Sequence, residues 1–379
     1  MTASREWLQR MRQRPGAYVG DVGGYGLHRL PLLLLQLGAL AASEGRGTEV
    51  RVRLEEGGAC TFTFDGLLWP KGLVPEPPGD ALERLCSLED KAPRPPKPDR
   101  APVALSTWDL GDVLAIVSGL SSKCELSVVL EGKAWRQSFV EGEPAGPSRE
   151  VPPPVGNRPA VKGTRIRFVP DRSVFESTRL SVLGLSRRMA ELAALHPGVS
   201  FWLNDDVRQL EERHCFARGL VEYSERLSQD AAPLHAPWFF EGQSEAVRVR
   251  LSLQWCRAPG SRVVTWVNQF RALGGAHVQG LLQGLAVALG HYARVARREW
   301  DYYGSFDEVL LFEGLTLLLD VSVPQPVWLG PVKERLANPE CEDDVARLVG
   351  PWLSERFEQE SLVATQVLDR HVGRCVAKG

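Results

Sequence analysis

Cysteine and histidine are the residue types in this 379-residue chain that could hold a metal ion or attack a substrate. The seven cysteines are scattered, with no CxxC pair and no histidine beside them at the spacing of a zinc ligand. The seven histidines are equally dispersed. The pattern predicts free thiols in a reducing cytoplasm, no metal site, and structural or surface roles for the histidines.

The segment that would position any other catalytic or binding residue is 14–43, whose sequence is RPGAYVGDVGGYGLHRLPLLLLQLGALAAS. After turn signals at Pro15, Gly16, Gly23 and Gly24, residues 30–42 are apolar on every side and predict a buried helix. This run of about 13 residues is shorter than the roughly 20 that a bilayer crossing requires. We therefore expect a core helix of a soluble protein.

Composition bounds the rest of the chain. Hydrophobic residues make up 44% and charged residues 24%, which suits two globular domains with sizeable cores. The formal net charge of -2 argues against a strongly basic nucleic-acid-binding protein, although a local basic face can exist within a neutral total. The net charge alone does not identify a binding partner.

Alternating segments predict strands on both sides of a proline-rich stretch. EVRVRL (49–54) and CTFTF (60–64) predict a hairpin, and KGTRIRFVPD (162–171) predicts a further strand. Residues 71–105 are dense in proline, with one short helical candidate at 81–88. Residues 180–195 predict an amphipathic helix and 199–203 a strand.

Several of these segments carry a resemblance. RPGAYVGD (14–21) followed by GLH (26–28), SGLSSKCELSVVLEGKAWRQSF (118–139) and KGTRIRFVPD resemble the ATPase region of bacterial type II topoisomerases, the B subunits of DNA gyrase and topoisomerase IV. FARGLVEYSERL (216–227) and GGAHVQGL (274–281) are similar to the transducer domain that follows it. The resemblance spans residues 7 to about 357. It implies an α+β chain: a GHKL (Bergerat-type) sandwich over residues 1–217, then a ribosomal-S5-like transducer domain over 218–379.

The resemblance also implies where the family's catalytic groups would lie. The general-base Glu position is Leu33, the Mg-binding Asn position is Leu37, and two later carboxylate positions are Leu40 and Ala41. A leucine neither accepts a proton from water nor binds a cation. No catalytic residue and no metal ligand is therefore expected here.

The nucleotide-binding positions are altered as well. The Asp that binds adenine in the family is Phe64 here, and Leu67 and Leu68 replace the Arg and second Gly of its motif. An unsatisfied adenine amino group would cost about 1 to 3 kcal/mol. The remnants of the family's nucleotide-binding residues are Asp65, Gly66, Gly111, Thr164 and Lys333.

Other candidates are weaker. Glu44 and Glu49 lie near the end of the helix and could be named as substitute bases, but no phosphate loop or metal ligand accompanies them. Leu282 and Val287 occupy the transducer positions at which gyrase presents arginines to DNA. Several tryptophans near turns are candidates for partner contacts, since Trp anchors many interfaces: Trp69, Trp108, Trp135, Trp238 and Trp328.

These substitutions predict a gyrase B-like pseudo-ATPase, not an enzyme, that binds neither ATP nor Mg and acts through protein contacts as a regulator or scaffold in the cytoplasm. Its expected partner is an unknown protein, such as a gyrase or topoisomerase subunit, and DNA is an unlikely partner. One alternative is a divergent ATP-binding ATPase component of a type II topoisomerase. The other is a DNA-binding module.

Overall fold

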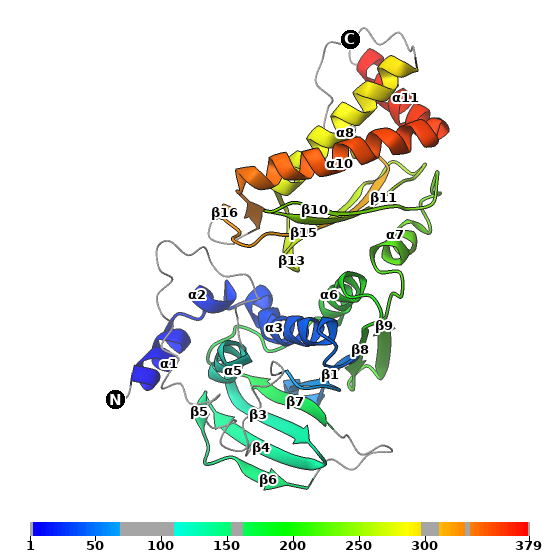
Figure 1. Ribbon diagram of the computed structural model, residues 1–379. Helices are drawn as coiled ribbons and strands as arrows, with labels where there is room; N and C mark the ends of the chain where they lie inside the picture. Colours follow the sequence, from blue (N-terminus) through cyan, green and yellow to red (C-terminus); the bar gives the residue numbers. More distant parts are fainter. Residues whose placement is uncertain (1–2, 69–109, 153–161, 297–310, 330–333, 378–379) are drawn as a thin grey trace. The chain divides into compact units, whose positions relative to one another are not determined.

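The chain forms two compact units in the computed structural model, which describes residues 3–68, 110–152, 162–296, 311–329 and 334–377. The first unit ends at Gly219 and the second begins at Leu220, close to the boundary predicted after residue 217. Each unit combines helices with a β-sheet (Figure 1). The expected α+β class is confirmed. The helix predicted at 81–88 lies outside the described residues.

The first unit is built on a nine-stranded sheet with the order β5-β4-β3-β7-β2-β1-β8-β9, in which β6 also pairs with β4. β1 and β2 have the bounds that the alternation predicted, and β1 pairs in parallel with β8 and antiparallel with β2. β9 was not expected from the sequence. The strands are β1 (Glu49–Leu54), β2 (Cys60–Phe64), β3 (Ser121–Leu130), β4 (Lys133–Val140), β5 (Glu143–Pro144), β6 (Arg149–Val151), β7 (Lys162–Pro170), β8 (Ser200–Asp205) and β9 (Leu210–His214).

Helices α3 (Gly24–Ser43), α5 (Leu110–Gly119) and α6 (Val182–Leu195) lie side by side on one face of this sheet (Figure 1). α3 is longer than predicted because Asp21 accepts hydrogen bonds from the backbone N–H groups of Gly23 and Gly26, which satisfies donors of the first turn. Gly38 allows α3 to approach the sheet, since a Cβ there would lie 3.0 Å from both Phe62 and Val50. Among the described residues, no helix is both long and apolar enough to cross a membrane.

The N-terminal helix α1 (Ala3–Gln13) is tied to the first unit and precedes the short helix α2 (Gly16–Val19). Its apolar residues Leu8 and Met11 are buried, and both lie against Gly119 at the end of α5. Arg12 donates to the Gly119 carbonyl at 2.8 Å and pairs with Asp171 just after β7. The N-terminal helix is therefore packed into this unit.

The second unit has a five-stranded sheet of order β10-β11-β15-β12-β13 and a small sheet of β14, β17 and β16. The GGAHVQGL segment (274–281) covers β14 and the start of α8, whereas β10, α10 and α11 were not predicted. The bounds are α7 (Leu220–Ser228), β10 (Trp238–Gln243), β11 (Arg248–Trp255), β12 (Arg262–Val267), β13 (Phe270–Ala272), β14 (Gly274–Gly275), α8 (Ala276–Val295), β15 (Leu315–Ser322), β16 (Trp328–Leu329), β17 (Arg335–Leu336), α10 (Pro339–Gln359) and α11 (Ser361–Ala377).

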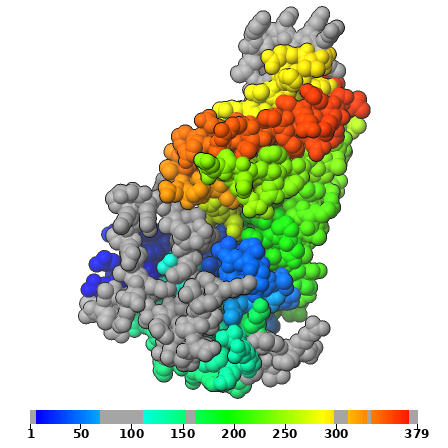
Figure 2. Space-filling view, viewed as in Figure 1, coloured from blue at the N-terminus to red at the C-terminus, as the bar shows by residue number. Residues whose placement is uncertain are grey.

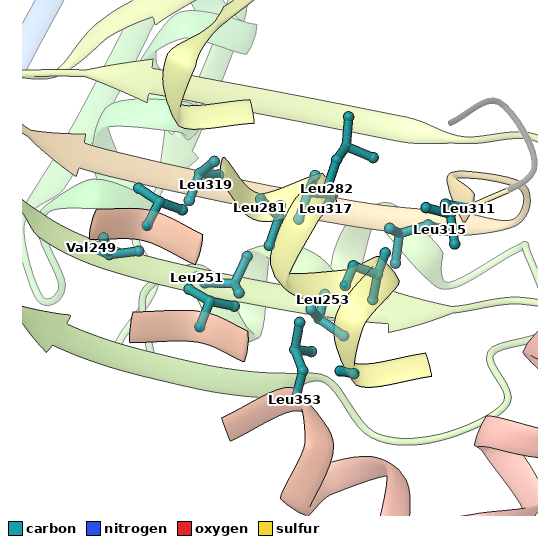
Figure 3. Packing of buried hydrophobic residues seen from close by; sticks show 14 of the residues in the cluster. Val249, Leu251, Leu253, Leu281, Leu282, Leu311, Leu315, Leu317, Leu319 and Leu353 are labelled. Carbon is teal, nitrogen blue, oxygen red and sulfur yellow. The ribbon is translucent and has the colours of Figure 1, made fainter. Parts of the chain in front are cut away.

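Leucines from α8, β11 and β15 fill the core of the second unit (Figure 3). α8 packs tightly on α10, which runs along the surface of this unit in Figure 2. A Cβ on Gly280 would lie 2.2 Å from the Glu342 carbonyl oxygen, so glycine is required for this close helix contact. The sheet and α10 thus enclose much of α8.

This packing corrects the interpretation of Leu282. Its side chain is 4% exposed and lies in the leucine core (Figure 3), so this position faces the protein interior and not a DNA cavity. Val287 is 65% exposed. Trp238 is likewise a core residue, packed edge-on against Trp255 and Phe357 with its indole N–H donating to Glu360 at 2.7 Å.

Candidate functional site

The helix positions that carry the general base and the Mg ligand in the resembling family lie in the core of the first unit. Leu33 is 3% exposed and Leu37 is 7% exposed. They are four residues apart on α3, so they share one face of the helix. Ala41, one further turn along, is fully buried. This face of α3 offers hydrocarbon where proton transfer and metal binding would need oxygen or nitrogen atoms.

Phe64 is equally enclosed. It is 0% exposed and lies between Val50 of β1 and Thr164 of β7 in the sheet. Gly47 and Gly66 make room for the ring, because a Cβ on either would lie within 3 Å of ring carbons. Leu68, which follows in the same motif, is 4% exposed. The benzyl group therefore serves as a core side chain at the end of β2.

Asp65 holds together two segments of the chain. Its carboxylate accepts hydrogen bonds from the backbone N–H groups of Thr48 at 2.8 Å and Glu49 at 2.9 Å, and from the Thr48 hydroxyl at 2.9 Å. These three bonds fix the start of β1 against the end of β2. The sequence marked Asp65 as a remnant of adenine binding, and its contacts here are structural.

Thr164 and Gly66 form a second such connection. The Thr164 hydroxyl donates to the Gly66 carbonyl at 3.0 Å and accepts from the Leu68 N–H at 3.4 Å. A Cβ on Gly66 would lie only 1.9 Å from the Arg46 carbonyl oxygen, so only glycine fits there. Arg46 itself donates to the Leu67 carbonyl at 3.2 Å. Both remnants thus stabilise the loop that follows β2.

The other predicted site residues are dispersed. Gly111 is buried in the first turn of α5, and Lys333 lies outside the described residues. Glu44 pairs with Arg46 at 2.7 Å and Glu49 pairs with Arg51 at 2.8 Å. Each carboxylate is engaged by a nearby arginine, so neither is placed as a base for chemistry on α3.

No thiol or metal centre replaces the lost carboxylates in the described part of the chain. Cys60, Cys124, Cys215, Cys256 and Cys341 are free, and burial raises the pKa of the Cys60 thiol, which makes it unreactive. Within the described ranges, no group of three or more His, Cys, Asp or Glu side chains could hold a metal ion. His277 of α8 bonds the Thr265 hydroxyl at 3.0 Å, and burial lowers its pKa to about 4. It is a neutral core histidine.

These residues do not fit a Mg²⁺–nucleotide bound as in the family. Mg²⁺ requires oxygen ligands, and the side chains at positions 33, 37 and 41 have none. The adenine position is filled by the Phe64 ring, and Asp65 and Thr164 are engaged within the protein. We derive no hydrolytic step from this geometry.

Known proteins resemble the chain along nearly its full length. The family model described as DNA gyrase B matches residues 219–377. The chloroplastic/mitochondrial DNA gyrase B subunit of Oryza sativa is 31% identical over 96% of this chain and 51% of its own length. The type 2 topoisomerase B subunit of Aquifex aeolicus is 27% identical over 98% of this chain and 46% of its own length. The chain thus spans about half the length of the curated relatives it matches.

Solved structures of gyrase B subunits resemble the chain as well. The B-subunit of the DNA gyrase from Myxococcus xanthus has a TM-score of 0.80 at 29% identity, covering 96% of this chain and 99% of that one. The 43K ATPase domain of Thermus thermophilus gyrase B, solved with an aminocoumarin, has a TM-score of 0.75 at 26% identity, covering 98% and 96% of the two chains. These likenesses confirm the predicted GHKL-type sandwich and transducer architecture.

One prediction is wrong in view of these comparisons. The substitutions at Leu33, Leu37 and Phe64 were interpreted as the mark of a chain that is not an enzyme. The relatives, at about 30% identity over most of the chain, are named as DNA gyrase B subunits, and none of the comparisons sets this chain apart as inactive. Loss of the family's site residues was by itself too narrow a basis for that conclusion.

The expectation that no cofactor binds, with the five remnants as traces of the family's site, stays a prediction. The cytoplasmic location also stays a prediction, since plant relatives are named as chloroplastic or mitochondrial. The comparisons of sequence and of structure support the same resemblance. Across both of its units, this chain resembles the N-terminal ATPase and transducer region of the DNA gyrase B subunits.

Proposed function

We propose that this chain is a divergent ATP-binding component of a type II topoisomerase, similar to its B subunits. The observation that carries the proposal is the similarity to gyrase B over 96% of the chain, with the same succession of two units at a TM-score of 0.80. A chain that kept only a general scaffold would not need to keep both units in this order. The partner we propose is a topoisomerase subunit of the A type.

Nucleotide binding in this proposal uses a rearranged site. Leu33 and Leu37 take no part in water activation or metal binding, because hydrocarbon side chains cannot do either. Gly111 remains in the first turn of α5, where backbone N–H groups of a helix start favour an anionic phosphate. Asp112 in the same turn opposes that attraction, so we expect weak binding.

The test measures association and nucleotide response separately. The full chain is mixed with a purified A-type topoisomerase subunit and analysed by sedimentation, and its melting temperature is measured with ATP and Mg²⁺. Ligand at about 100 times its Kd stabilises a folded protein by about 2.7 kcal/mol, which is a clear thermal shift. We expect complex formation and an ATP-dependent rise.

ATP turnover is then followed with the partner subunit and plasmid DNA present. The matched control is ADP with Mg²⁺ under the same conditions. Absence of both complex formation and any nucleotide response would overturn the proposal. Complex formation without a nucleotide response would remove ATP binding from it and leave the subunit role.

A further inference from the structure

The register of the first sheet aligns five arginines across one of its faces. Residues that pair in neighbouring strands point to the same side of a sheet. Following the pairs from β9 to β6 gives a continuous line of partners: Arg213, Trp202, Arg51, Thr63, Arg165, Ser127, Arg136 and Arg149. We call the five arginines of this line the arginine row. It contains no carboxylate.

The arginine row lies on the face away from the helices. Val50, Val52, Ile166 and Phe168 alternate with its members along the strands and are fully buried in the core that α3 covers. Arg165, Arg149 and Arg213 are exposed. Thr63 and Ser127, which separate three of the arginines, have short side chains, so the guanidinium groups can project beyond them.

Three of the five arginines in the row have no ion-pair partner in the part of the chain that the structure describes, although the charge of Arg165 also acts on the Glu55 carboxylate. Glu49 pairs with Arg51 at 2.8 Å and Glu125 approaches Arg136 at 3.5 Å. In the part of the chain that the structure describes, no carboxylate lies within ion-pair distance of Arg149, Arg165 or Arg213. Arg213 donates to the Ser200 hydroxyl at 3.0 Å. The net charge of -2 for the whole chain therefore conceals a line of cations on one face.

The spacing of the row suits a long anion. Neighbouring strands lie about 4.8 Å apart, so arginines on β9, β1, β7 and β4, at every second strand, recur about every 10 Å. The whole row crosses seven strand spacings, about 34 Å, which is about one turn of B-DNA. A single small anion would use only one of these positions.

The surroundings of Trp202 indicate which kind of nucleic acid the arginine row suits, a duplex or a single strand. Single-strand binders stack bases on exposed aromatic rings. Here the Arg51 guanidinium lies 4.6 Å and the Arg213 guanidinium 5.4 Å from the centroid of the Trp202 ring, so cations occupy the place of a base. What the arginine row offers is guanidinium and hydroxyl donors, which bind phosphates without reading sequence.

We propose that the arginine row is a binding surface for the phosphate backbone of duplex DNA. The proposal deepens the proposed function by giving a topoisomerase component a DNA contact on its N-terminal unit, and it replaces the expectation that DNA is an unlikely partner. The interaction is electrostatic and independent of base sequence. It requires neither ATP nor a partner subunit, so its failure would leave the proposed function standing.

The experiment titrates the full chain against a fluorescently labelled duplex of about 20 base pairs, longer than the row, at several salt concentrations. Anisotropy reports binding without ATP or partner. The test variant is the triple Arg149→Gln, Arg165→Gln, Arg213→Gln. Each lost phosphate contact lowers the magnitude of the slope of log K against log salt by about 0.9, so a fall of about 2.7 and a loss of affinity of about tenfold or more are expected.

The matched control is the triple Arg172→Gln, Arg179→Gln, Arg187→Gln. These arginines are also exposed and lie in the first unit, in the segment after β7 and on α6. The control changes net charge equally, so a long-range effect of charge would affect both variants alike. We expect the DNA affinity and salt slope of the control variant to stay near those of the unchanged chain. Both triple variants should keep the unfolding midpoint of the unchanged chain.

The single variant Arg165→Glu keeps the test decisive if the triple variant fails to fold. It places a carboxylate in the middle of the row and should weaken binding more than Arg165→Gln does. Equal binding by the two triples, binding that Arg165→Glu leaves unchanged, tighter binding of a single strand of the same length, or no duplex binding at low salt would each overturn the proposal.

Discussion

The two faces of the N-terminal sheet are built from the same strands and follow opposite rules. On β7, Ile166 and Phe168 are fully buried, whereas Arg165, between Thr164 and Ile166, is exposed. The inner face is close-packed, so a substituted side chain there must be apolar and have a similar volume. Side chains on the outer face are not restricted in this way. Phe64, at a position that carries chemistry in the resembling family, is a core residue on the inner side, whereas the outer side carries charged residues.

The strongest test of the inner face is Phe64→Ala. The ring is fully buried, and its removal should lower the free energy of unfolding by about 3 to 5 kcal/mol. Thr63→Ala, one residue earlier and on the outer face, is the control and should change it by less than about 0.5 kcal/mol. Both are measured by chemical denaturation. Near-equal values would mean that the ring borders an open site that a nucleotide could enter.

A smaller effect is expected from Gly66→Ala. The new Cβ would meet the Arg46 carbonyl oxygen at 1.9 Å, and the loop after β2 would have to move, at a cost of about 1 to 3 kcal/mol. Gly24→Ala, at the start of α3, meets nothing within 4 Å and serves as the control. If the two variants have the same unfolding midpoint, the close contact between these loops does not exist in solution.

Acid should loosen the attachment of α1. Burial alone would raise the pKa of Asp171, but hydrogen bonds from Arg12 and from Ser173 outweigh it and hold the pKa below its usual range. A carboxylate with a lowered pKa stabilises the fold above its unfolded-state pKa, and this stability is lost as the pH falls through the folded-state value. The melting temperature should therefore fall below about pH 4.

The melting temperature of the Asp171→Asn variant should fall less steeply over the same acid range, because the asparagine side chain has no charge to lose. Asp343→Asn is the control, since Asp343 is exposed on α10 and should leave the acid slope unchanged. Parallel acid slopes for the unchanged chain and Asp171→Asn would show that the Arg12 pair contributes nothing to the pH dependence.

Local alternation was enough to predict much of the inner face. EVRVRL and CTFTF predicted β1 and β2 with the bounds that the structure has, because apolar and polar residue types alternate along both segments. In the structure, Arg51 and Arg165 lie on the outer face with Thr63 between them. Their alignment was not visible from the sequence, since it depends on the pairing of β7 with β2, which are distant in sequence.

Other features needed the packed structure. Leu282 was assigned to a DNA-facing surface, but helix periodicity alone does not say which side of α8 the sheet and α10 enclose. Asp65 was recognised only as a family remnant, and its three bonds to residues 48 and 49 follow from the β1–β2 pairing. The pairing of Glu44 with Arg46 and of Glu49 with Arg51 could have been predicted, because each arginine lies only two residues after its glutamate in the sequence.

The smallest expected effect concerns Trp202 on the outer face. A cation held over an aromatic ring at an exposed site contributes about 0.5 to 1 kcal/mol. A double-mutant cycle with Arg51→Gln and Trp202→Leu should give a coupling of that size in the free energy of unfolding. Arg53→Gln with Trp202→Leu is the matched control, because Arg53 pairs with Asp206 at 2.8 Å and is not over the ring. No coupling in the first cycle would mean that Arg51 does not hold the ring, which Arg213 alone would then cover. The ring would be more accessible to the bases of a single strand, and the outer face would differ from the inner face by an aromatic surface as well as by charge.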